Sequence, residues 1–223
     1  TAVYTAVATD VDAGTTLTYS LSGADAALFN IDSTTGVVTF KASPNYESPA
    51  DAGGNNVYDI SVSASDGTLT TTQAVAITVT NVNEAPAFTS GATATVAENI
   101  STSTAVYTAV ATDVDAGTTL TYSLSGADAA LFNIDSTTGA VTFKASPNYE
   151  SPSDAGGNNV YDISVSASDG TNITTQAVAI TVTNVNEAPA FTSGATATVS
   201  ENVSTSTAVY TAVATDVDAG TTL

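Results

Sequence analysis

Carboxylate and amide side chains are the groups of this chain that could do chemistry. Asp and Glu together number 22, Lys and Arg number 2, and the 223-residue sequence contains no His, Cys, Met or Trp. A Ser-His-Asp triad, a Cys nucleophile and a Cys/His zinc site are therefore excluded. Carboxylate, amide, hydroxyl and carbonyl oxygens are the ligands that a hard cation such as Ca²⁺ takes. The composition favours calcium chemistry.

The acids and their neighbouring Asn residues recur in five short settings, each at the end of an expected strand. These are an Asp-x-Asp pair (Asp10 and Asp12, Asp113 and Asp115, Asp216 and Asp218), an Ala-Ser-Asp-Gly turn (Asp66, Asp169), a Pro-Asn-Tyr-Glu loop (Glu47, Glu150), an Asn-Val-Asn-Glu-Ala-Pro linker (Asn81, Asn83 and Glu84; Asn184, Asn186 and Glu187) and a Glu-Asn pair (Glu98, Glu201).

An internal repeat places these settings at regular intervals. The segment 1–10 returns 103 residues later, from Thr104, and again from Thr207. A shift of 103 residues aligns 120 positions, of which only six differ. A period of this length is the size of a small autonomous domain. We expect residues 1–84 to form a repeat that lacks its first strand, residues 85–187 a complete repeat, and residues 188–223 the N-terminal part of a third.

The apolar segments are short, alternate with Thr and Ser, and are separated by Gly and Asn turns, which is typical of half-buried strands. In the second repeat this pattern predicts seven strands and no long helix; the strands are expected near 94–98, 104–112, 118–124, 130–134, 139–144, 160–167 and 176–184. Seven short strands in about 100 residues indicate an immunoglobulin-like sandwich. The predicted fold is all-β, with tandem seven-stranded β-sandwiches joined end to end.

In type and order, the five acidic settings resemble those of cadherin repeats, in particular the bacterial cadherin-like kind found in large surface adhesins or filaments, and the resemblance covers the whole chain. It implies Ca²⁺ ions bound between successive repeats. The first junction would use Glu47, Asn81, Asn83, Glu84, Asp113, Asp115 and Asp169. The second would use Glu98, Glu150, Asn184, Asn186, Glu187, Asp216 and Asp218. Asp10, Asp12 and Asp66 would serve a junction with a preceding repeat.

The sequence departs from the family pattern in ways that weaken calcium binding. Asn81 and Asn184 stand where the family has Asp, and so do Asn45 and Asn148; Glu84 and Glu187 replace a linker Asp in a linker one residue shorter. Fewer carboxylates predict weaker binding or fewer than the family's usual three ions.

Other interpretations of the acids are weaker. Acidic loops can serve solubility alone. An EF-hand that begins at Asp10 would need Gly and Glu where Thr15 and Leu21 stand. Paired carboxylates also occur in glycosidases, but here they would lie at domain poles without a Trp platform for a sugar. Asn99, Asn172 and Asn202 begin N-x-Ser/Thr sequons, which leaves glycosylation open.

We therefore expect a non-enzymatic, calcium-rigidified structural spacer of a cell-surface or secreted adhesin or filament. Its partners would be neighbouring repeats of the same array and, in the alternative, identical chains. A net charge of −20 argues against nucleic acid and anionic lipid as partners. The alternative hypothesis is that the repeats themselves mediate homophilic or glycan adhesion, or assemble into a fibre by strand exchange.

Overall fold

The computed structural model describes residues 1–222, and Leu223, the last residue of the expected third repeat, lies outside the described residues. The chain divides into two compact units, Thr1–Asn83 and Glu84–Leu223. Both units are built from strands, and the only helices among the described residues are two 3-10 turns of three residues each. No helix within residues 1–222 has the length and apolar character needed to cross a bilayer.

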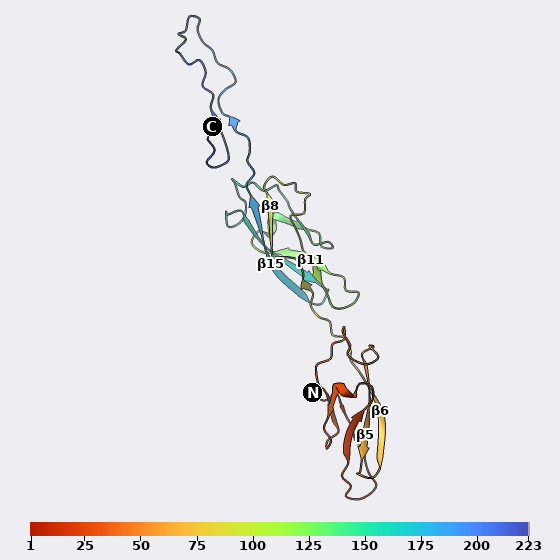
Figure 1. The fold of residues 1–223 in the computed structure, drawn as a ribbon. Coiled ribbons are helices and arrows are strands. Elements are labelled where there is room, and N and C mark those ends of the chain that lie inside the picture. Colours follow the sequence, from red (N-terminus) through yellow and green to blue (C-terminus); the bar gives the residue numbers. More distant parts are fainter. Residues whose placement is uncertain (223) are drawn as a thin grey trace. The chain divides into compact units, whose positions relative to one another are not determined.

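The first unit contains two antiparallel sheets, with strand orders β2-β5-β6 and β1-β4-β3. Its elements are β1 (Tyr4–Thr5), β2 (Thr18–Ser22), η1 (Ala26–Leu28), β3 (Phe29–Ile31), β4 (Val37–Phe40), β5 (Val57–Ser65) and β6 (Thr70–Thr78). In Figure 1, β5 and β6 run side by side as the long strands of this unit. Phe29, Phe40 and Tyr58 pack ring against ring between the two sheets.

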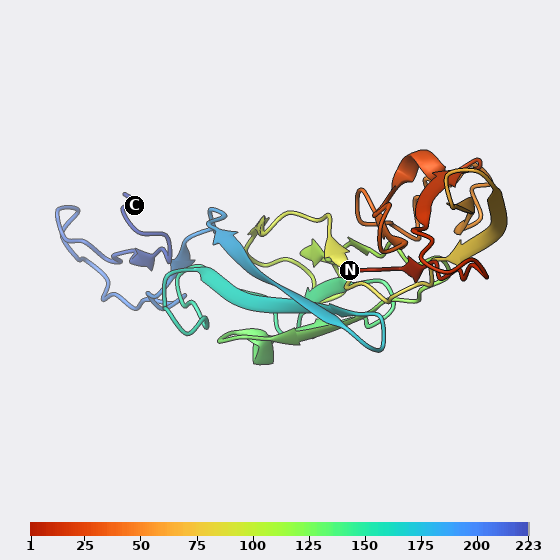
Figure 2. The same ribbon diagram turned by 90° about the horizontal axis from the view of Figure 1, so that it is seen from below.

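The second unit contains a four-stranded sheet, β11-β14-β15-β8, and a three-stranded sheet, β12-β13-β9, with two short ribbons, β10-β7 and β16-β17. Its elements are β7 (Ala87–Phe88), β8 (Thr93–Ala97), β9 (Tyr107–Thr108), β10 (Ala111–Thr112), β11 (Thr121–Ser125), η2 (Ala129–Leu131), β12 (Phe132–Ile134), β13 (Ala140–Phe143), β14 (Val160–Ser168), β15 (Ile173–Thr183), β16 (Ala190–Phe191) and β17 (Ala214–Thr215). Figure 2 shows β14 and β15 as a long twisted pair.

Alternation along β14 and β15 builds the core of this unit. Tyr161, Ile163 and Val165 are buried, and they pair in register with Ile180, Val178 and Gln176 of β15. Side chains alternate between the faces of a strand, so the apolar set of β14 faces inward together. The Tyr161 ring packs edge-on against Phe132 and Phe143 of the facing sheet. The arrangement is the expected sandwich.

The parallel pairing of β8 with β15 makes the core of the second unit more complete than that of the first. Ala97 lies beside Thr183 in this pairing. Val178 and Ile180 are buried under it, whereas the corresponding Val75 and Ile77 of β6 are only partly buried. Within residues 1–222, β6 pairs only with β5.

The strand expected at 104–112 is the clearest correction. It consists of two short strands that belong to different sheets: β9 pairs with β13, and β10 pairs with β7. The chain changes sheets at Val110, whose N–H donates to the Ser90 hydroxyl and whose carbonyl accepts from Thr89 and Ser90. These contacts come from a segment 20 residues away in sequence, which local patterning does not reveal.

Candidate metal centre

Three glutamates of the second unit meet where its linker leaves the sandwich. Carboxylate oxygens of Glu98, Glu150 and Glu187 lie within 4.8 Å of one another. Glu98 follows β8, Glu150 lies between β13 and β14, and Glu187 follows β15. The parallel β8–β15 pairing brings the first and third together, since the Glu98 N–H continues the ladder by donating to the Thr183 carbonyl at 3.0 Å. We call Glu98, Glu150 and Glu187 the glutamate triad.

Glu98 is the most buried member of the triad, with only 3% of its surface exposed. Its Oε1 accepts a hydrogen bond from the Val185 N–H at 2.9 Å, and its Oε2 accepts one from the Tyr149 N–H at 2.8 Å. Backbone N–H donors stabilise an ionised carboxylate. Glu98 therefore fixes both the linker and the loop that carries Glu150.

The other two glutamates each leave one oxygen unsatisfied. The Asn99 side-chain amide donates to Oε1 of Glu187 at 2.7 Å. Oε2 of Glu187 and Oε2 of Glu150 are buried and have no hydrogen-bond partner among the described residues. A buried anionic oxygen without a partner is costly. A cation with oxygen ligands would remove that penalty, so the donor set fits Ca²⁺.

The raised pKa of Glu187 also indicates that the triad lacks a compensating positive charge. Burial, followed by the charge of Glu98, raises the pKa of Glu187 above its usual range; Glu150 and Asp218 add to this, whereas the Asn99 hydrogen bond opposes it. The two lysines are engaged elsewhere, because the ammonium groups of Lys41 and Lys144 donate to the Ala27 and Ala130 carbonyls. Like charges at this separation repel one another.

Asp218, from the segment after the linker, contacts the linker itself. Its Oδ1 accepts from the Asn184 side-chain amide at 2.8 Å, and its Oδ2 accepts from the Glu187 N–H at 2.8 Å. Asp216 Oδ1 accepts from the Asp218 N–H at 2.9 Å. The Asn186 amide donates to the Glu187 carbonyl. These hydrogen bonds engage five of the residues expected at the second junction.

The residues expected at the first junction belong to both units. Glu47 lies between β4 and β5 of the first unit, and Asn81 and Asn83 follow β6. In the second unit, the Glu84 N–H donates to Asp115 Oδ2 at 2.9 Å, and the Asp115 N–H donates to Asp113 Oδ1 at 2.9 Å. Asp169 Oδ1 accepts from two N–H groups of its own turn, those of Thr171 and Asn172.

The three acids assigned to a preceding repeat lie together in the first unit. Asp10, Asp12 and Asp66 line one open hollow of about 340 Å³. Asp66 Oδ1 accepts from the Leu69 and Thr68 N–H groups at 2.6 Å, and these bonds lower the pKa of Asp66. The carboxylate of Asp66 thus also closes its own turn.

Sequence reasoning missed the role of Asn99, which it treated as the neighbour of Glu98 in the Glu-Asn pair and as a sequon. Asn99 has a φ of 61°, in the left-handed region that Asn tolerates better than most residues. This conformation accompanies the bond from its side-chain amide to Glu187. An Asn directly after a ligand-type Glu was the only available signal, because Glu187 lies 88 residues away.

Comparison with known proteins identifies the repeat unit. A model of the cadherin domain matches residues 92–186. Human Protocadherin Fat 1 is 32% identical over 227 residues, covering 95% of this chain, and mouse Protocadherin Fat 2 is 35% identical over 139 residues, covering 60%. The chain spans only 5% and 3% of the length of these curated relatives. They do not support the bacterial origin suggested by the sequence.

A solved structure shares the tandem arrangement. Human CDH23 EC21-23 superposes with a TM-score of 0.64 at 20% identity, covering 98% of this chain and 80% of that one. This likeness confirms the all-β fold of tandem domains. Cadherin domains are non-enzymatic extracellular modules, which confirms the expected class and location. They bind Ca²⁺ at their linkers, in agreement with the calcium expected here.

Proposed function

We propose that this chain, whose residues 92–186 match the cadherin domain, is a spacer of an extracellular adhesion protein, stiffened by calcium at its junctions. In this account the glutamate triad holds one Ca²⁺ ion where the linker leaves the second unit. Ca²⁺ supplies a shared positive charge with six to eight oxygen ligands. The domain boundaries at 84/85 and 187/188 and the full ligand sets expected from the sequence are part of the same proposal.

The unsatisfied Oε2 atoms of Glu150 and Glu187 are the single observation that carries the proposal. Glu98 is already bonded through both oxygens, so it positions the site and adds negative charge. Glu150 and Glu187 are the members with an oxygen free to take a cation. Because they come from different loops, an ion bound to both would restrict the movement of the linker relative to the sandwich.

Calorimetric titration of the chain with CaCl₂ tests the proposal. Extracellular calcium modules bind with dissociation constants of about 10⁻⁴–10⁻³ M, and we expect binding in that range. Magnesium should bind more weakly, because it demands a near-ideal octahedral geometry. No binding of calcium at 10 times the upper end of that range, roughly 10 mM, would contradict the calcium role.

A further inference from the structure

The loop that carries Glu150 is held by two hydrogen bonds at the residue before it, Tyr149. The Tyr149 N–H donates to Glu98 Oε2 at 2.8 Å, and the Tyr149 carbonyl accepts from the side-chain amide of Asn159 at 2.9 Å. Glu150 itself has a buried Oε2 without a hydrogen-bond partner among the described residues. The place of the Glu150 carboxylate in the triad therefore depends on how firmly the backbone of its neighbour is held.

A hydrogen-bonded turn before β14 fixes Asn159. Asp154 is 7% exposed; its Oδ1 accepts from the Asn159 N–H and its Oδ2 from the Asn158 N–H, both at 3.0 Å. The Ala155 N–H donates to Oδ1 of the buried Asp128 at 2.7 Å, which attaches the turn to the residue before η2. Hydrogen bonds to a charged acceptor are stronger than neutral ones. The turn is thus a firm support from which the Asn159 side chain reaches the neighbouring loop.

Asn159 is unfavourable for folding in two respects. Its φ is 62°, in the left-handed region, and its Oδ1 is buried with no hydrogen-bond partner within residues 1–222. A buried polar atom without a partner costs free energy. The Tyr149 carbonyl can only accept, so the amide must turn its NH₂ group toward it. Strained residues of this kind cluster at functional sites, and here the strained residue supports the loop of a triad member.

The first unit contains the same arrangement and so offers a matched comparison. Asn56 has a φ of 61°, its side-chain amide donates to the Tyr46 carbonyl at 2.8 Å, and its buried Oδ1 also lacks a partner among the described residues. Asp51 Oδ1 accepts from the Asn56 N–H at 3.0 Å. Glu47, the residue after Tyr46, is the counterpart of Glu150. A substitution at Asn56 therefore changes the same contact beside a different glutamate.

We propose that Asn159 is a positioning residue for calcium at the second junction: by holding the Tyr149 carbonyl, it keeps the Glu150 carboxylate at the glutamate triad. Groups that orient a metal ligand through hydrogen bonds commonly change metal affinity about 10–100-fold when they are removed. The calcium part of this inference rests on the proposed function, whereas the ordering of the loop by Asn159 does not.

An NMR titration with CaCl₂, followed at the carboxyl carbons of Glu150 and Glu47, tests the calcium part. Asn159→Gly removes the amide and introduces a residue that adopts the left-handed conformation readily. The calcium concentration at the midpoint should rise about 10–100-fold at Glu150 and stay the same at Glu47. Asn56→Gly is the matched control and should leave the Glu150 midpoint unchanged. An unchanged Glu150 midpoint in Asn159→Gly, or equal rises at both glutamates, would overturn the proposal.

Amide hydrogen exchange in EGTA distinguishes positioning from direct ligation and from a general loss of stability. The Tyr149 N–H should exchange faster in Asn159→Gly than in the wild-type chain, and the β14 amides from Ile163 onward should keep their wild-type rates. Weaker calcium binding with unchanged Tyr149 exchange would make Asn159 a ligand and overturn the positioning role. Faster exchange throughout β14 would overturn it as well, because the whole sandwich would then be affected.

The same two measurements separate this inference from the proposed function. If Glu150 in the wild-type chain does not respond to calcium, the proposed function fails, and the Tyr149 exchange rate alone decides whether Asn159 orders the loop. If Glu150 responds to calcium equally in the wild-type chain and in Asn159→Gly, the proposed function stands and the positioning role of Asn159 is wrong.

Discussion

The Asn99 side-chain amide donates a hydrogen bond of 2.7 Å to Glu187 Oε1, joining two residues that lie 88 positions apart in the sequence. The bond ties the end of β8 to the linker after β15 and satisfies Oε1 of Glu187, whereas Oε2 of Glu187 has no hydrogen-bond partner among the described residues. Three glutamates and one amide thus converge where the linker leaves the sandwich.

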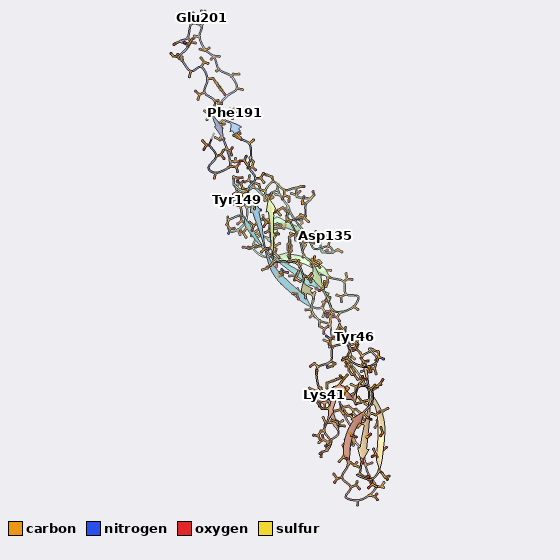
Figure 3. The ribbon with its side chains drawn as sticks, in the orientation of Figure 1. Lys41, Tyr46, Asp135, Tyr149, Phe191 and Glu201 are labelled. Carbon is orange, nitrogen blue, oxygen red and sulfur yellow. The ribbon has the colours of Figure 1, made fainter. Side chains whose placement is uncertain are left out.

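Substitution of Glu150 tests the ligand role most simply. Glu150→Gln removes one negative charge and keeps the size of the side chain, so calcium affinity at this junction should fall about tenfold or more, by analogy with the loss of a supporting metal contact. Isothermal titration calorimetry measures it. Asp135→Asn is the control, because Asp135 lies elsewhere in the unit (Figure 3) and its carboxylate accepts from the Thr137 and Thr138 N–H groups of its own turn. Equal affinity losses in both variants would contradict the role of Glu150.

Acidification without calcium should protonate Glu187 at a pH above the ordinary range of a glutamate, because its pKa is raised. Its pKa is raised, chiefly by burial and then by Glu98, above the ordinary value of 4.5. The protonated form is favoured in the folded arrangement, so its stabilising contribution is complete below that ordinary value and is lost as the pH rises through the raised pKa. An NMR titration of the Glu187 carboxyl carbon in EGTA should show a midpoint above 4.5.

Asn99→Ala provides the matched variant for this titration. The Asn99 hydrogen bond lowers the pKa of Glu187, so its removal should move the midpoint further upward. A titration midpoint at or below 4.5 in the wild-type chain would contradict the burial of Glu187 beside Glu98. A lower midpoint in Asn99→Ala than in the wild-type chain would contradict the hydrogen bond from Asn99.

A buried and an exposed isoleucine on the same strand test the packing of the second unit. Ile180 is fully buried, whereas Ile173 is 66% exposed. Ile180→Ala should destabilise the unit by about 2–5 kcal/mol through lost burial and a residual cavity. Ile173→Ala should change stability by less than about 0.5 kcal/mol. Hydrogen exchange of the β14 amides reports on this unit alone; similar effects of the two substitutions would contradict the assigned strand faces.

Two glycines test a close backbone approach at β9. Gly139 has a φ of +71°, and a Cβ there would collide with the Ala109 carbonyl oxygen; Gly157 has a φ of +61° and open space around it. Gly157→Ala should cost about 1–2 kcal/mol, the penalty of the left-handed conformation alone. Gly139→Ala should destabilise the unit more than Gly157→Ala, because the backbone at Ala109 must also shift to make room for the new Cβ. Thermal unfolding measured by calorimetry checks the order, and the reverse order would contradict the approach.

The sequence predicted the architecture well because its signals were local or repeated. Alternating apolar residues in 160–167 indicated β14, and the 103-residue period indicated the tandem units. It could not predict that 104–112 divides between two sheets, since that depends on Ser90 contacting Val110. Strand register and sheet exchange are set by tertiary partners that a local pattern does not contain.

The candidate site was only partly accessible to sequence reasoning. Glu98, Glu150 and Glu187 were expected together through the family resemblance, and the structure places them in one cluster. The hydrogen bonds from Asn99 to Glu187 and from Asn184 to Asp218 were not foreseen, because each joins side chains that are distant in sequence. In the sequence, Asn184 in place of an Asp looked like a lost calcium ligand. The structure shows that its side-chain amide donates a hydrogen bond to Asp218.

The central claim, that calcium stiffens the junctions, is tested most directly by small-angle X-ray scattering of the chain in millimolar calcium and then in excess EGTA. Calcium should narrow the range of overall lengths that the chain adopts, and chelation should broaden that range. The circular dichroism spectrum, which reports the strand content, should stay the same in both conditions. Scattering profiles that are identical with and without calcium would contradict the claim and leave the acids a role in solubility.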